Sequence, residues 1–237
     1  MPYIQEEFFT IENYTSSKYT NSADCLNTVS EQGRNATPID VFPAVRAVLG
    51  EIELDMASDL VINKEVKANR ILTLEEDGFN STIKAQSVWL NPPGTTVTGG
   101  TYAERLYWLE QMRLPPDQRG NRPEKVKVVS GSQWIRKLYD AYKAEDVKSA
   151  IVLIYRGGSI GSLSQEILSN PICITCSGAS SPVINNSGRL SFEIIENDQR
   201  RSQPNNTQSS MFILFPKDDT MIESFKKHFS VFGVVKV

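Results

Sequence analysis

The feature that most constrains the fold is a short apolar run, Ser149–Tyr155, with the sequence SAIVLIY. A strand with one face in water alternates apolar and polar residues, whereas this run is apolar at almost every position. Such a strand is buried on both faces, as in a sheet that carries helices on either side. The run therefore predicts the central strand of an α/β fold.

The rest of the chain alternates helical and extended patterns around this strand. Helices are expected over 38–49, 60–69, 101–112, 132–145, 159–169 and 219–229. Further strands are expected over 52–57, 87–90, 171–176, 189–195, 211–215 and 231–237. Because helices alternate with strands early and antiparallel-looking strands cluster late, we expect a three-layer α/β sandwich with a mixed sheet.

Composition divides the chain into an arm and one domain. Residues 1–36 are rich in Ser, Thr, Asn and Glu but also carry aromatics, which predicts an arm that packs on the body. Residues 37–237 form the domain, in which Thr37 is the expected N-cap of the first helix and Gly50 its stop. Residues 95–130 are the least regular stretch and are expected to form an inserted loop.

Bulk properties point to an ordinary globular chain. Hydrophobic residues make up 40% of the 237 positions and the net charge is −3. No window approaches the 18 or so apolar residues that a membrane span needs, and the N-terminus does not resemble a signal peptide. We therefore expect no membrane association and a cytoplasmic location.

The charge is unevenly distributed, however. Residues 113–137 hold seven basic side chains against two acidic ones. A local basic patch on an acidic protein can contact phosphates, although a solvated loop explains the same composition. The basic residues of interest are Arg119, Arg122, Lys125 and Lys127.

Cysteine and histidine give little support to metal chemistry. Cys173 and Cys176 have the C-x-x-C spacing of a zinc half-site or a redox pair, but there is no second such pair. The one histidine, His228, is distant in sequence. The apolar setting favours small buried residues near a strand end, so we expect no metal site.

The run Asn91-Pro92-Pro93 carries the clearest chemistry. It follows the apolar Val88-Trp89-Leu90, so it lies at the carboxyl end of a strand, where open α/β sheets bind ligands. An asparagine side-chain oxygen and a carbonyl held by a proline corner are two acceptors for the N–H groups of an exocyclic amine. A plain strand-ending turn is the alternative interpretation of this tripeptide.

From about Thr37 to Phe215 the order of motifs resembles the phage-type DNA N6-adenine methyltransferase family, also called Dam-like. The Trp89-Leu90-Asn91-Pro92-Pro93 block is the most specific match. The other matching segments are Thr37-Pro38, Leu54-Asp55-Met56-Ala57-Ser58, Asn63 with Ala68, Glu75–Phe79, the helix 131–142, the strand 150–155 and Arg189–Phe192.

The resemblance implies a Rossmann-like class I methyltransferase that uses S-adenosylmethionine and transfers a methyl group to adenine N6 of a flipped-out base in DNA. It implies that Asn91, Pro92 and Pro93 hold the target amine. It also implies a cofactor site formed by Thr37, Pro38, Asp55, Ala57 and Ser58, with Asp77 near the cofactor's adenine or the target pocket. Asp55 could instead cap a helix, and Asp77-Gly78 could be only a turn.

Two departures keep other functions open. The loop after Asp55 lacks the usual glycines, and Gly94 stands where the family has an aromatic residue that stacks on the base. A ring could come from Tyr102, Tyr107, Trp108 or Trp134. These departures motivate one alternative, a catalytically weak or inactive DNA-binding or partner subunit with the same fold. Because the same acceptors would hold other amine or amide nitrogens, an N4-cytosine methyltransferase and a protein glutamine methyltransferase are further alternatives. If the protein acts on DNA, Arg119, Arg122, Lys125 and Lys127 of the inserted loop are expected to contact the DNA backbone.

Overall fold

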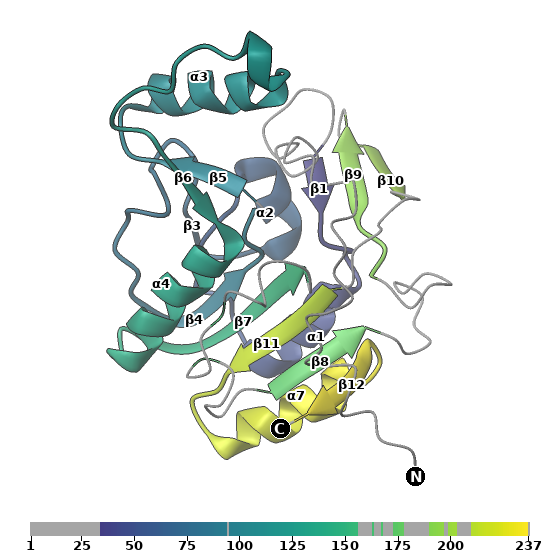
Figure 1. Cartoon of the computed structure of the whole chain (residues 1–237). Coiled ribbons are helices and arrows are strands. Elements are labelled where there is room, and N and C mark those ends of the chain that lie inside the picture. Colours follow the sequence, from purple (N-terminus) through teal and green to yellow (C-terminus); the bar gives the residue numbers. More distant parts are fainter. Residues whose placement is uncertain are drawn as a thin grey trace, which may run out of the picture.

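The structure is a computed structural model that describes residues 34–93, 95–155, 163, 167, 173–177, 190–196, 199–202 and 210–236. Within these residues, seven strands form one mixed sheet in the order β12–β8–β11–β7–β4–β2–β3 (Figure 1). The strands are β2 (Leu54–Asp55), β3 (Arg70–Ile71), β4 (Ala85–Leu90), β7 (Val147–Tyr155), β8 (Cys173–Ser177), β11 (Ser210–Phe215) and β12 (Gly233–Lys236).

The sheet is parallel on one side and antiparallel on the other. Strands β3, β2, β4 and β7 run parallel to one another. Strand β11 is antiparallel to both β7 and β8, and β12 is antiparallel to β8. The chain passes from β2 outward to β3, and then returns to β4 on the opposite side of β2. The strand order therefore reverses between β2 and β4, which makes their carboxyl ends the topological switch point of the sheet.

The apolar run that predicts a central strand is buried on both faces. Alternate residues of a strand point to opposite faces. In β7, Ala150, Val152 and Ile154 join one hydrophobic cluster, whereas Ile151 and Leu153 join a second one. The prediction of a strand buried on both faces is confirmed.

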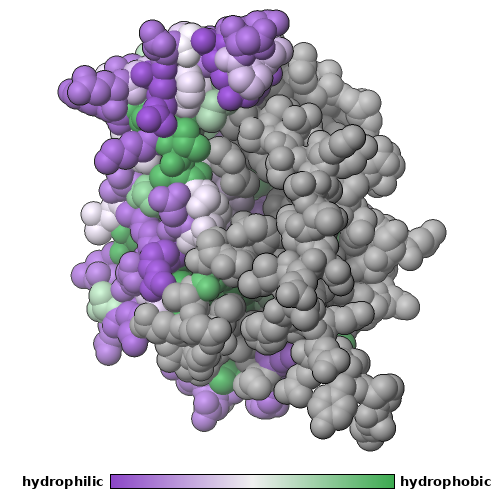
Figure 2. Space-filling view, in the orientation of Figure 1, coloured by the Kyte–Doolittle hydropathy of each residue, from purple (hydrophilic) through white to green (hydrophobic). Residues whose placement is uncertain are grey.

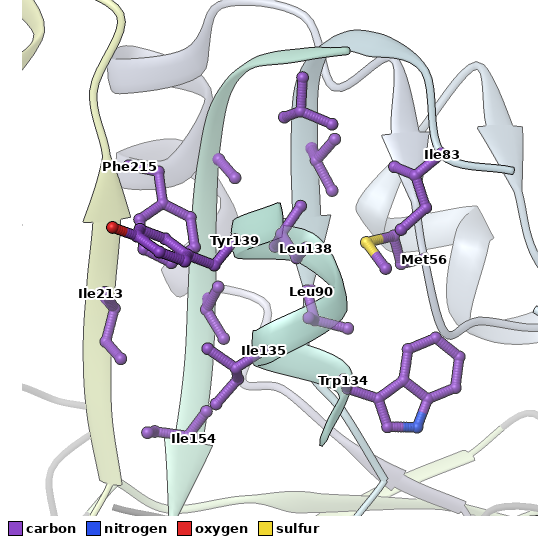
Figure 3. Packing of buried hydrophobic residues seen from close by; sticks show 14 of the residues in the cluster. Met56, Ile83, Leu90, Trp134, Ile135, Leu138, Tyr139, Ile154, Ile213 and Phe215 are labelled. Carbon is purple, nitrogen blue, oxygen red and sulfur yellow. The ribbon is translucent and has the colours of Figure 1, made fainter. Parts of the chain in front are cut away.

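Helices cover the two faces. The α4 helix (Gly131–Lys143) packs on the first cluster, and Figure 3 shows its Trp134, Ile135, Leu138 and Tyr139 against residues of the sheet. The α1 helix (Val41–Leu49) and the α7 helix (Asp219–Phe229) pack on the second cluster. The described part of the chain is therefore a mixed α/β sheet flanked by helices.

The first helix begins later than its sequence predicts. The α1 helix starts at Val41 after a turn in which the Val41 N–H donates to the carbonyl of Pro38, and its N-cap is Asp40. Thr37 is therefore not the N-cap, and its hydroxyl accepts a hydrogen bond from the Asn91 side chain. Gly50 ends the helix as predicted, with a positive φ of 75° and an N–H that donates to Arg46.

The short α2 helix (Leu60–Val66) connects β2 to β3. Asp59 caps its N-terminus by accepting from the N–H groups of Val61 and Ile62. At the other end, the amide of Asn63 exchanges two hydrogen bonds with the backbone of Ala68. The strand β3 that follows has only two residues and was not predicted.

Residues 95–130, called the insert below, are more regular than predicted. Strands β5 (Thr95–Thr98) and β6 (Lys127–Ser130) form a two-stranded antiparallel sheet. The α3 helix (Tyr102–Arg113) and a 3-10 turn, Pro116–Gln118, lie between them. Val97, Leu109, Met112 and Val126 form a separate small core. Thus the insert is a folded unit and not an irregular loop.

A second, three-stranded sheet joins distant parts of the chain. Strand β9 (Glu193–Glu196) pairs antiparallel with β1 (Arg34–Ala36) and with β10 (Gln199–Ser202). The strand predicted over 189–195 is therefore shifted, and it lies outside the main sheet. The helix predicted over 159–169 lies largely outside the described residues, as do most of the arm and Gly94. Among the described helices, none has the length and apolar character needed to cross a bilayer.

Candidate functional site

Asp55 and Asn91 come together at the switch point of the sheet. Asp55 ends β2 and pairs in register with Trp89 of β4, and Asn91 follows the last residue of β4. The Met56 N–H donates to the Trp89 carbonyl at 3.1 Å, which continues the ladder past the end of β2. The two polar side chains that the sequence singles out therefore leave adjacent strands at the same edge.

Thr37 joins them from a third segment. The Asn91 side chain donates through Nδ2 to the Thr37 hydroxyl at 3.1 Å, although the two residues are 54 positions apart. Thr37 is only 4% exposed and Pro38 is buried beside it. Because Nδ2 is engaged with Thr37, the Oδ1 acceptor of Asn91 is left for another group. Among the described residues, Oδ1 has no hydrogen-bond partner.

The two prolines that follow Asn91 end the strand β4. Pro92 is buried and Pro93 is half-buried, and both lie outside regular secondary structure. Proline fixes φ and has no N–H to donate, so the ladder of β4 stops at this point. The predicted end of the strand near Asn91 is confirmed.

Asp55 is a buried carboxyl group with few partners. It is 1% exposed, and its Oδ1 accepts from the Ala57 N–H at 3.2 Å. Burial raises the pKa of Asp55 to about 7, although the hydrogen bonds from Ala57 and the Ser58 hydroxyl act to lower it. Asp55 does not cap a helix, since Asp59 caps α2. A buried carboxyl group of this kind is suited to a cationic ligand, which would offset its desolvation.

The loop after Asp55 is tied to the next strand. The Ser58 N–H donates to the Leu72 carbonyl at 3.1 Å, and the Leu72 N–H donates to the Asp55 carbonyl at 2.9 Å. Ala57 and Ser58 are both half-buried. These contacts hold Ala57 and Ser58, which the resemblance assigns to the cofactor site, beside the Asp55 carboxyl group.

Asp77 has no described contact with Asp55 or Asn91, and its hydrogen-bond and ion-pair partners lie in its own turn and in the insert. Its carboxylate accepts from the Thr98 hydroxyl, from the Gly99 N–H at 2.7 Å and from the Asn80 amide at 2.8 Å. Arg105 lies 3.7 Å away as an ion pair. Asp77 occupies a turn with a positive φ of 54°. Its described contacts therefore join the turn to the insert, and none of them reaches Asp55 or Asn91.

Arg105 is a structural residue that the sequence does not reveal. It is 3% exposed and donates five hydrogen bonds to the carbonyl oxygens of Leu74, Glu75, Gly99 and Gly100. An arginine within a polar helix ordinarily points to solvent, and α3 has no clear apolar face that would mark a buried side.

The basic residues of the insert divide into two kinds. Arg119 donates to the carbonyl oxygens of Leu114 and Met112, at 2.9 and 3.2 Å, and so caps the end of α3. Arg122, Lys125 and Lys127 are exposed. Figure 2 shows a mostly hydrophilic surface over α3 at the top of the molecule.

The four candidate aromatics also divide. Trp134 is 4% exposed and makes an edge contact with Phe79 at 5.2 Å, so it belongs to the core. Trp108 is half-buried and packs on the small core of the insert. Tyr102 and Tyr107 are exposed on α3. The two tyrosines are therefore the candidates with rings open to solvent.

A hollow of about 810 Å³ lies at the opposite edge of the sheet, near the amino ends of β2 and β4. Its polar groups are largely engaged with one another: the Ser87 hydroxyl bonds the backbone of Glu51 and Glu53, and the Ser149 hydroxyl donates to Gln86. Ligands of open α/β sheets bind at the other edge. This hollow is therefore not the candidate site.

No protein-family model, no curated protein and no solved structure matches this chain. Its function must therefore be inferred from the chemistry of its own residues.

Proposed function

We propose that this protein is an S-adenosylmethionine-dependent methyltransferase that modifies the N6 amine of adenine in DNA. One observation carries the proposal. The Asn91 amide, oriented by Thr37, stands at the topological switch point beside the buried Asp55 carboxyl group. An acceptor for an amine and a carboxyl group for a cation thus share one edge of the sheet.

The sheet topology supports the class I methyltransferase fold. The expected three-layer sandwich has a mixed sheet, and here the antiparallel β11 lies between β7 and β8 while helices cover both faces. Fold alone does not determine function, so the proposal depends on the residues at the switch point.

The residues present fit the proposed cofactor. Asp55 is a buried carboxyl group that lacks a cationic partner among its described contacts, and the cofactor carries positive charge on its sulfonium and amino groups. Thr37, Pro38, Ala57 and Ser58 would line the same site. When bound there, S-adenosylmethionine would supply an electrophilic methyl group.

The chain's own residues prepare the nucleophile. An exocyclic amine of adenine is weakly nucleophilic because its lone pair is delocalised into the ring. Asn91 Oδ1 accepts a hydrogen bond from one N–H of the amine, and the Pro92 carbonyl accepts a hydrogen bond from the other. The nitrogen lone pair is then directed out of the ring plane. Thr37 fixes the amide so that Oδ1, and not Nδ2, meets the amine. The base reaches these groups after rotation out of the duplex.

The same two acceptors would hold a cytosine N4 amine, so the product of the reaction discriminates between the targets. The protein is incubated with methyl-labelled cofactor and mixed-sequence DNA, and the nucleosides are analysed by mass spectrometry. We expect label in N6-methyldeoxyadenosine. Label in N4-methyldeoxycytidine would replace the adenine assignment, and label only in protein glutamine would refute a DNA substrate.

Two variants test the role of the loop. Asn91→Ala removes the amine acceptor, and we expect it to abolish methylation. Asn69→Ala is the matched control, since Asn69 is exposed at the opposite edge of the sheet. Calorimetric titration with S-adenosylmethionine distinguishes the non-catalytic partner subunit, which would give no binding heat. Full activity in Asn91→Ala would contradict the proposed mechanism.

A further inference from the structure

The insert is joined to the body at one end of its two-stranded sheet, β5 and β6. Thr95 and Ser130 are paired in register where the chain enters and leaves it. A two-stranded ribbon is by itself a weak and pliable support. The small core around Leu109 and Met112 stabilises the interior of the insert, and Leu74 of the body packs against it.

Val129 of β6 packs in the main core, and the polar contacts that orient the insert on the body converge on one turn, residues 73–81. Asp77 accepts from Thr98 and Gly99 at the tip of β5. In the opposite direction, Arg105 of α3 donates to the carbonyl oxygens of Leu74 and Glu75. The carboxylate of Asp77 and the guanidinium of Arg105 thus cross between the two units.

The same turn packs on the loop that follows β2. A Cβ atom at Gly78 would lie 2.9 Å from the Cβ of Leu72 and 3.1 Å from the Met56 carbonyl oxygen, so there is no room for a side chain. Met56 follows Asp55 directly and donates to Trp89, two residues before Asn91. A continuous set of close contacts therefore connects the switch point with the insert.

The Asp77 carboxylate is ionised in this setting. Burial acts to raise its pKa, but hydrogen bonds from Thr98, Gly99 and Asn80, together with the charge of Arg105, outweigh burial and lower it. Arg105 in turn is almost fully buried and has Asp77 as its nearest described anion. Hydrogen bonds to ionised groups are stronger than those between neutral groups. They suit a fixed connection between the 73–81 turn and the insert, which is called the joint below.

We propose that Asp77 is a positioning residue that holds the insert in one orientation relative to Asn91, so that DNA bound by the insert is aligned with the amine-binding loop. This inference rests on the proposed function and deepens it. It gives Asp77 a role in aligning DNA through the insert, and not a direct contact with the cofactor or with the target base.

The test compares Asp77→Ala and the milder Asp77→Asn with Glu75→Gln. Glu75 is exposed in the same turn and its side chain has no described contact, so its variant removes one charge without disturbing the joint. Three quantities are measured on the full chain: the Kd for S-adenosylmethionine, the KM and kcat with DNA, and backbone hydrogen exchange without ligands.

We expect Asp77→Ala to raise the KM for DNA about tenfold, a size typical of residues that couple two sites without touching either ligand. The Kd for S-adenosylmethionine should change by less than about twofold, since no contact of Asp77 reaches Asp55. Amides of 73–81 and 98–100 should exchange faster, while those inside α3 stay protected. Asp77→Asn should lie between wild type and Asp77→Ala, and Glu75→Gln should match wild type.

Two results would overturn the proposal. An unchanged KM for DNA despite faster exchange at the joint would show that orientation of the insert has no bearing on the substrate. An equal loss of cofactor affinity would return Asp77 to the cofactor site. Failure of the wild-type protein to bind S-adenosylmethionine would refute the proposed function instead. Even then, unchanged hydrogen exchange in Asp77→Ala would show that Asp77 does not hold the insert in place.

Discussion

At the scale of single residues, the buried carboxyl group of Asp55 makes stability depend on pH. Its pKa is raised from the ordinary value of 3.8 to about 7 by burial. The folded chain therefore holds a proton that the unfolded chain releases between these values. The free energy of unfolding should be highest near pH 4, fall as the pH rises to 7, and then level off.

The pKa gap corresponds to an upper bound of about 4 kcal/mol. Asp55→Asn keeps the shape of the side chain and removes its titration, so the decline between pH 4 and 7 should largely disappear. Urea unfolding at a series of pH values measures the effect. A variant that retains the pH profile of the wild-type chain would show that Asp55 is not the titrating group.

Thr37 gives a second residue-scale prediction. Thr37→Val keeps the shape but removes the hydroxyl that holds Asn91. We expect kcat to fall about 10- to 100-fold, as when a group that orients a metal ligand is removed. Thr37→Ser should restore most of the activity because it restores the hydroxyl. Equal loss in both variants would argue against the hydrogen bond as the cause.

The residue types at the site could be predicted from sequence, but their contacts could not. Asn91 stands out because it follows an apolar run at a strand's carboxyl end, and Asp55 because it matches the acidic strand end of the family that the chain resembles. The bond between Thr37 and Asn91 was not foreseen, because it depends on a turn that delays α1 until Val41. Arg105 was missed because its acceptors are backbone carbonyls, which leave no trace in the pattern of side chains.

At the scale of elements, the stability of the insert depends on the glycine that follows β5. Gly99 has a φ of 77°, and a Cβ there would lie 2.3 Å from the Lys125 carbonyl oxygen. Gly99→Ala should therefore destabilise the insert by more than the about 1–3 kcal/mol that an unfavourable φ costs alone. Hydrogen exchange of α3 and urea unfolding measure the local and global effects.

Gly50→Ala is the matched control for that variant. Gly50 has a similar φ of 75°, but a Cβ there would meet nothing within 4 Å. The difference between the two variants isolates the collision with Lys125 from backbone strain. Equal destabilisation by both substitutions would mean that the insert relaxes to accept the new methyl group.

Elements with strong periodicity were predicted well, and those held by tertiary contacts were not. The α3 and α4 helices begin and end within two residues of the expected positions. In contrast, β5 and β6 were interpreted as an irregular stretch because four-residue strands give a weak pattern. Strands β1 and β10 also escaped prediction, since each depends on pairing with β9 rather than on its own pattern.

At the scale of the whole molecule, an acidic chain must approach a polyanion through a restricted surface. The net charge is −3, so binding to DNA requires a locally basic region. The insert offers exposed Arg122, Lys125 and Lys127 on the unit that overhangs the carboxyl ends of the parallel strands (Figure 1). Arg119 is engaged in capping α3 and is a weaker candidate for phosphate contact.

This division gives a salt-dependent prediction for DNA binding. Each phosphate contact contributes about −0.9 to the slope of log K against log salt concentration. The double variant Arg122→Ala with Lys127→Ala should therefore make the slope less negative by about 1.8 and weaken binding at low salt. Arg119→Ala should lower the stability of α3 and leave the slope nearly unchanged. Fluorescence anisotropy at several salt concentrations measures each slope.

The control removes equal charge from the far side of the molecule. Lys84 and Lys217 are exposed around the hollow at the opposite edge of the sheet. A Lys84→Ala and Lys217→Ala double variant lowers the net charge by the same amount, so any effect of total charge alone appears in both. If the two double variants shifted the slope equally, DNA would be responding to net charge, and the insert would lose its assignment as the DNA-contacting unit. If only the insert variant shifted it, the position of the charges would be the cause.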